Sequence, residues 1–173
     1  SIIATATIDT TGIASIVPSI DLVSPWVVQT TGDFDNNGTD DLLLRNSNDS
    51  THQIQFFDGN APIKTVTLDP IADTAWNIVG NGDFNDDGHL DLLWRNSNTG
   101  DNALWYLKDG DRIGGQLLQA APNLDWDVVG VSDYNNDGEE DILWHNEVKG
   151  LNAVWYFNDA QRIGSELVDS LII

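Results

Sequence analysis

The stretch that decides the fold is Trp76-Asn-Ile-Val-Gly-Asn-Gly-Asp-Phe-Asn-Asp-Asp-Gly-His-Leu-Asp-Leu-Leu-Trp94. It places a tryptophan, a short apolar segment, an acidic loop and a second apolar segment in a fixed order. The same order starts at Trp26 and at Trp126, so the chain repeats itself every fifty residues. Such a period is typical of stacked supersecondary units, each of which buries its apolar faces against its neighbours.

Each repeat carries an acidic loop with oxygen-bearing side chains at positions one, three, five and nine. Glycine at position six (Gly38, Gly88 and Gly138) suits the tight turn, because glycine reaches left-handed backbone angles without steric cost. Carboxylate, amide and main-chain oxygens are the ligands that calcium takes in proteins. We therefore expect three calcium sites, with position seven offering its main-chain carbonyl. The predicted ligands are Asp33, Asp35, Asn37, Thr39 and Asp41; Asp83, Asn85, Asp87, His89 and Asp91; and Asp133, Asn135, Asp137, Glu139 and Asp141.

Other interpretations of the loop fit less well. An EF-hand begins in the same way, but it needs glutamate at position twelve and a helix on each side. Position twelve is Leu44, Trp94 or Trp144, inside an apolar run that is typical of a buried strand. Magnesium keeps its waters and demands strict octahedral geometry. A plain turn also favours Asp, Asn and Gly, but it does not need oxygens at positions three and nine in all three copies.

Composition excludes several classes of function. Seven basic against 28 acidic residues give a net charge of −21, which disfavours nucleic acid and anionic membranes as partners. No apolar stretch approaches the ~20 residues of a membrane span, so we expect no membrane insertion. The chain has no cysteine, which excludes disulfides and thiol catalysis.

The expected calcium sites also indicate a location. Calcium loops of ordinary affinity fill where calcium is plentiful, so we expect a secreted or cell-surface protein. Asn37-Gly-Thr39 is a formal glycosylation sequon, yet a glycan on Asn37 would occupy a ligand position. A bacterial source therefore fits better than a eukaryotic secretory one.

We expect an all-β fold with four short strands in each repeat. The first strand precedes the loop and the second follows it directly, while the outer pair is expected at 53–57 and 64–68, 103–107 and 115–118, and 153–157 and 165–168. The second strand is apolar on consecutive residues, so both of its faces must be covered. Radial stacking of four-stranded sheets covers both faces, which favours a β-propeller with blades of ~40 to 50 residues.

Trp76 to Gly88, followed by Asp91-Leu-Leu-Trp-Arg-Asn96, resembles a bacterial FG-GAP or VCBS-type repeat. Residues 126–146 match it nearly as well. The resemblance implies a propeller related to that of integrin α-subunits, with D-x-[DN]-x-[DN]-G-x-x-D calcium loops between the first two strands of a blade. The first repeat departs from the pattern at Thr30, where the other two repeats have glycine.

The repeats divide the chain into residues 26–75, 76–125 and 126–173, and residues 1–25 align with the outer strand pair of an incomplete blade. About three and a half four-stranded blades hardly close a ring, and an unpaired blade exposes apolar faces and strand edges. We therefore expect either a piece of a longer propeller or self-association that completes the ring.

Three functions stay open. The resemblance implies an extracellular module for adhesion or protein interaction, in which calcium is structural. A lectin-like propeller with a glycan ligand is an alternative, since tryptophan faces stack on sugars, although tryptophans at fixed blade positions also suit packing between blades. Its candidate residues are Trp105, Trp155, Arg95 and His145, with Arg45 as a further polar neighbour. The third is a non-catalytic accessory domain of a secreted enzyme; we expect no catalysis by the chain itself, because its paired carboxylates lie in the metal loops.

Overall fold

The structure is a computed structural model that describes residues 3–8, 14–19, 25–121 and 123–168. These residues form three four-stranded antiparallel sheets and one two-stranded hairpin. In this part of the chain no helix is long and apolar enough to cross a membrane. The predicted all-β class is confirmed.

Each repeat forms one sheet in which successive strands are neighbours. Blade one contains β3 (Trp26–Gly32), β4 (Asp41–Asn46), β5 (His52–Asp58) and β6 (Ala61–Thr67). Blade two contains β7 (Trp76–Gly82), β8 (Asp91–Asn96), β9 (Asn102–Lys108) and β10 (Asp111–Leu118). Blade three contains β11 (Trp126–Ser132), β12 (Asp141–Asn146), β13 (Leu151–Asn158) and β14 (Gln161–Val168). The hairpin pairs β1 (Ile3–Ile8) with β2 (Ala14–Ser19).

The fourth strand of each blade begins earlier than predicted. It starts at residue 61, 111 or 161, rather than at 64, 115 or 165. A β-bulge explains the difference, because Ile63, Ile113 or Ile163 is the extra residue between two paired segments. The short segment before the bulge has no apolar alternation. The sequence pattern therefore predicted only the part of the strand that follows the bulge.

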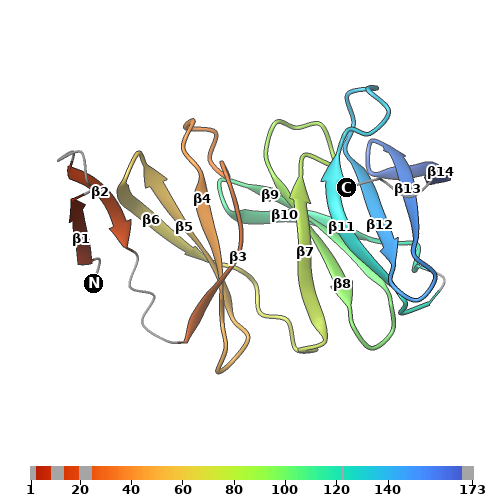
Figure 1. The fold of residues 1–173 in the computed structure, drawn as a ribbon, viewed down its shortest axis with the longest axis horizontal. Coiled ribbons are helices and arrows are strands. Elements are labelled where there is room, and N and C mark those ends of the chain that lie inside the picture. The colour runs from red at the N-terminus through yellow and green to blue at the C-terminus, as the bar shows by residue number, and fades with distance from the viewer. Residues whose placement is uncertain (1–2, 9–13, 20–24, 122, 169–173) are drawn as a thin grey trace.

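The three blades lie in a row and stack through two apolar cores (Figure 1). The first core joins Ile54 and Phe56 of blade one to Leu92 and Trp94 of blade two. The second core joins Leu93 and other residues of blade two to blade three. Strand β8 therefore has apolar side chains on both faces because a blade covers each of them, as its uninterrupted apolar run predicted.

The first strands of neighbouring blades lie close together. A Cβ atom on Gly80 of β7 would come within 2.7 Å of Val131 Cγ2 on β11. Thr30 and Asn81 occupy the corresponding positions between blades one and two, and the Thr30 hydroxyl donates to Asn81 Oδ1 at 2.8 Å. A hydrogen-bonded Thr–Asn pair thus replaces a Gly–Val contact, which explains how the first repeat tolerates its departure at Thr30.

The blade-like sheets do not close into a ring within the described residues (Figure 1). The predicted incomplete blade at 1–25 lies partly outside those residues, as does the end of the predicted repeat 126–173. The propeller is accordingly a proposal that extends the observed row of blades.

Candidate metal centres

The aspartate at position nine anchors each acidic loop to the sheet. Asp41, Asp91 and Asp141 open the second strand of their blades and are fully buried. Asp41 Oδ2 accepts from the Phe34 amide and Oδ1 from the Phe57 amide, both at 2.9 Å. The equivalent bonds measure 3.1 and 3.0 Å in the other two loops. Position nine therefore joins the loop to the third strand of the blade as well as to the second.

The aspartate at position one closes the turn. Asp33 Oδ1 accepts from the Asn37 amide at 3.0 Å, and its Oδ2 accepts from the Gly38 amide at 2.8 Å. Asp83 and Asp133 accept the same two bonds in their loops. Because three different sequences adopt one hydrogen-bond pattern, the loop geometry belongs to the motif rather than to one copy.

Two residues in each loop adopt left-handed backbone angles. The glycine at position six has φ values of 87°, 84° and 96° in the three loops, as predicted. The residue at position four is also left-handed, with φ values of 58° at Asn36, 54° at Asp86 and 61° at Asn136. Sequence reasoning missed this position, although asparagine and aspartate are the non-glycine residues that tolerate this conformation best.

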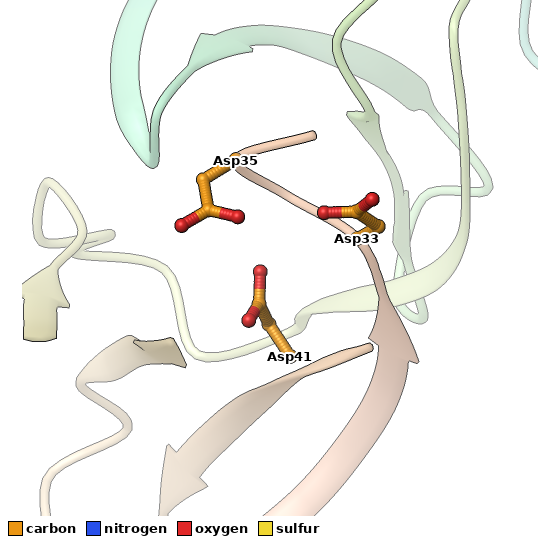
Figure 2. A group of neighbouring side chains, drawn as sticks. All are labelled: Asp33, Asp35 and Asp41. Carbon is orange, nitrogen blue, oxygen red and sulfur yellow. The ribbon is translucent and has the colours of Figure 1, made fainter. Parts of the chain in front are cut away.

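In the first loop, three carboxylates converge. Asp33, Asp35 and Asp41 each place an oxygen within 4.8 Å of the others, and Figure 2 shows their side chains pointing toward one space. This is the one such acidic group found among the described residues. The other loops have asparagine at position three, and the Asn85 amide donates to Asp87 Oδ2 at 3.1 Å. Each loop thus offers three aspartates and one asparagine, with the asparagine at position five in the first loop and at position three in the other two.

The electrostatics of the loops favour a cation. Burial raises the pKa of Asp91 to about 7, against two backbone hydrogen bonds that lower it, and the Asp87 and Asp83 charges raise it further. Burial raises the pKa of Asp41 and of Asp141 in the same way. A positive ion would offset this repulsion between like charges. With oxygen donors only and several carboxylates, the loop residues fit a hard divalent cation such as calcium.

Side chains at position seven have a structural role that the sequence did not indicate. Thr39 Oγ1 accepts from the Gly59 amide at 3.1 Å, and Glu139 Oε2 accepts from the Asp159 amide at 3.0 Å. Both bonds link the acidic loop to the turn of the outer hairpin. His89 instead faces the first loop, where its Nδ1 lies 3.5 Å from the side-chain amide of Asn36. Only the main-chain carbonyls at position seven remain predicted ligands.

Glu140, at position eight of the third loop, is an acidic residue near the sites that sequence reasoning missed. It is half-buried against Gly82, and burial raises its pKa, with further contributions from Asp133 and Asp83. No signal could have identified it, because position eight is Asp40, Leu90 or Glu140 in the three copies.

The predicted sugar-binding residues do not lie together. Trp105 and Trp155 line two equivalent pockets. Arg95 is buried and donates to the Gly100 carbonyl at 3.0 Å, and His145 Nδ1 lies 2.7 Å from Asn152 Oδ1. Neither Arg95 nor His145 lines a pocket with the tryptophans. Arg45 joins blade one to blade two through Asn77 Oδ1 at 2.8 Å.

Residues 83–161 match a protein-family model described as an FG-GAP-like repeat. The matched segment holds the second and third acidic loops, so this part of the chain is similar to an FG-GAP repeat family. Calcium binding and the likeness to the integrin propeller go beyond this match. Neither the curated proteins nor the solved structures gave a match to the chain.

Proposed function

We propose that the chain is a calcium-stabilised β-propeller module with one ion in each acidic loop. The observation that carries the proposal is the threefold recurrence of one loop geometry, in which a buried aspartate at position nine and the aspartate at position one both accept from backbone amides of the loop. The ion would be held by side-chain oxygens at positions one, three, five and nine and by the carbonyl at position seven. Bound calcium supplies the positive charge that offsets the repulsion between these carboxylates.

The proposed role of calcium is structural. Position nine already contacts both the loop and the third strand through backbone amides, for example Phe34 and Phe57 in blade one. An ion in the loop would fasten the first hairpin of the blade to that strand. Binding to the folded state alone contributes RT ln(1 + [Ca]/Kd), about 2.7 kcal/mol per site at a hundredfold excess over Kd.

The experiment that tests this role is thermal unfolding with excess calcium, with EDTA, and with magnesium at the same ionic strength. We expect the highest melting temperature in calcium and a clear decrease in EDTA. Magnesium is the matched control for divalent charge, and it should restore little of the loss because it dehydrates reluctantly. A melting temperature that EDTA leaves unchanged would contradict the structural role.

As a biological role we propose adhesion or protein interaction outside the cell, on a secreted or cell-surface bacterial protein. The similarity of residues 83–161 to FG-GAP-like repeats supports this proposal. Fluorescently labelled protein should bind to a cell surface in calcium and lose that binding in EDTA, as measured by flow cytometry. Equal binding in both conditions would exclude calcium-dependent adhesion.

Carbohydrate binding is the second candidate function. The observation that favours it is the placement of Trp105 and Trp155 at equivalent positions in two pockets.

A further inference from the structure

Blades two and three carry equivalent pockets at the outer part of their sheets. The pocket of blade two has a volume of about 310 Å³, and that of blade three about 350 Å³. Both volumes are at the lower end of the range for small-molecule sites. The blade-two pocket is lined by Trp76, Trp94, Ala103, Trp105, Arg112 and Leu117. The blade-three pocket is lined by Trp126, Trp144, Ala153, Trp155, Arg162 and Leu167, fifty residues further along the chain.

An arginine is fixed over a tryptophan in each pocket. The Arg112 guanidinium lies 4.2 Å from the ring centroid of Trp105, and the Arg162 guanidinium lies 3.9 Å from that of Trp155. Arg112 Nε donates to the Gly114 carbonyl at 3.1 Å, which orients the guanidinium. Its two terminal nitrogens donate no hydrogen bond to a described residue, so they are free to donate to a ligand. In the blade-three pocket, Arg162 Nη1 already donates to Gln119 Oε1 at 2.8 Å, which leaves its other terminal nitrogen for a ligand.

A second tryptophan adds a buried donor. The rings of Trp94 and Trp105 lie 4.7 Å apart, and so do those of Trp144 and Trp155. Trp94 and Trp144 are each 1% exposed, and the indole N–H of each has no hydrogen-bond partner among the described residues. A buried donor without an acceptor is unfavourable. The same buried indole N–H, unpaired within the described part of the chain, recurs in both blades, closed off from solvent.

Blade one does not carry these pocket residues. Leu44, Gln55 and Pro62 stand where blade two has Trp94, Trp105 and Arg112. Blade one nevertheless packs against blade two through a continuous apolar core. That core includes Trp94 and Trp105, so these two side chains pack against blade one and also line the pocket.

We propose that these two pockets bind a neutral saccharide ring, one in each blade. The apolar face of a pyranose suits the half-buried rings of Trp76 and Trp126, while its hydroxyl groups accept from the guanidinium. The net charge of −21 disfavours an anionic ligand. The inference deepens the carbohydrate-binding candidate and does not depend on calcium in the loops.

The test uses the calcium-loaded full chain and the methyl glycosides of glucose, galactose, mannose and N-acetylglucosamine. Indole N–H signals are followed by ¹H–¹⁵N NMR during each titration. We expect saturable shifts for six tryptophans with at least one glycoside, at two sites per chain. The seventh tryptophan, Trp26, is the internal control because it lines neither pocket. The six expected signals come from Trp76, Trp94, Trp105, Trp126, Trp144 and Trp155.

Two variants separate the pockets. Arg112→Gln is expected to weaken binding in blade two at least about tenfold, since a charged donor is lost, while the blade-three signals shift as in the wild type. Lys108→Gln removes an exposed cation from the same sheet outside the pocket and should change neither. The wild-type titration tests the proposal even where a variant unfolds.

Three results would overturn the saccharide proposal: no saturable shift with any glycoside, an equal shift of Trp26, or shifts produced by free indole but by none of the glycosides. The last result would show that the pocket binds apolar molecules and not sugars. Failure here is distinguishable from failure of the calcium proposal, because the effect of EDTA on melting is measured without a sugar.

Discussion

At the scale of single residues, Asp91 and Asp86 belong to the same acidic loop but differ in their proposed roles. Asp91 is buried at position nine, whereas Asp86 lies exposed at position four, where the other loops have Asn36 and Asn136. Asp91→Ala is expected to lower the bound calcium from three ions to two, measured by calorimetry with metal analysis. Asp86→Asn removes one charge from the same loop and should keep all three. An Asp91→Ala protein that still holds three ions would remove the ligand assignment.

His52 should make the stability sensitive to acid. It is 4% exposed, its ring meets Trp94 edge-on at 5.0 Å, and burial lowers its pKa from 6.5 to about 4, with Arg45 contributing. Between these two pKa values the unfolded state binds more protons than the folded state. The stabilising effect is therefore complete above about pH 6.5 and lost as the pH falls to about 4, by up to about 3 kcal/mol.

The matched variant is His52→Asn, because Asn102 and Asn152 stand at the same position in the other blades. Urea unfolding in saturating calcium at pH 4.5 and 7.5 gives the difference for each protein. We expect the wild type to lose more free energy of unfolding than the variant on acidification. An equal loss in both proteins would show that other groups carry the pH dependence.

At the scale of elements, two substitutions can convert the contact between β7 and β11 into the contact found between β3 and β7. Gly80→Thr should destabilise the fold because even a Cβ atom would crowd Val131. Adding Val131→Asn recreates the Thr30–Asn81 pair and should recover part of the loss. A double-mutant cycle measured by denaturant unfolding is expected to give a coupling of about 0.5–3 kcal/mol. Strictly additive effects would contradict this complementarity.

The outer hairpin of blade two depends on Gly110. This residue has φ 85°, and a Cβ atom would lie 2.7 Å from Phe56 Cζ of blade one. Gly59 also has a positive φ of 59°, but nothing lies within 4 Å of its added Cβ. Gly110→Ala should therefore lower the melting temperature more than Gly59→Ala does. The Gly59 variant is the control, because it adds only the backbone strain of a left-handed alanine, about 1 kcal/mol. Equal decreases would show that the contact with Phe56 is relieved without loss.

The sequence predicted those elements whose signals are local. The acidic loops and the apolar run of β8 are each recognised from a few consecutive residues, and the structure places them as expected. The bulge at Ile113 and the stacking of Arg112 on Trp105 could not be predicted, because both depend on how β10 is registered on β9. The recurrence of Arg-Ile-Gly at residues 112–114 and 162–164 was the one available signal.

At the scale of the whole molecule, the row of blades ends in a face like those buried within it. Leu143 and Val154 of blade three correspond to Leu93 and Leu104, which blade three covers in the second core. Val154 is itself only 3% exposed, whereas Leu143 is half-buried. No further sheet lies beyond blade three among the described residues (Figure 1). Because this face repeats a pattern that stacks on a blade, we expect a second copy of the chain to cover it.

Size-exclusion chromatography with light scattering tests this self-association. The expected mass is a multiple of the 19.0 kDa of one chain, and it should fall to one chain on dilution or in Leu143→Lys, which places a charge in the half-buried centre of the face. Val148→Lys is the control, since Val148 is 74% exposed in the turn between β12 and β13. A soluble wild-type monomer at every concentration would exclude a second copy, and the longer propeller would then be the remaining way to cover blade three.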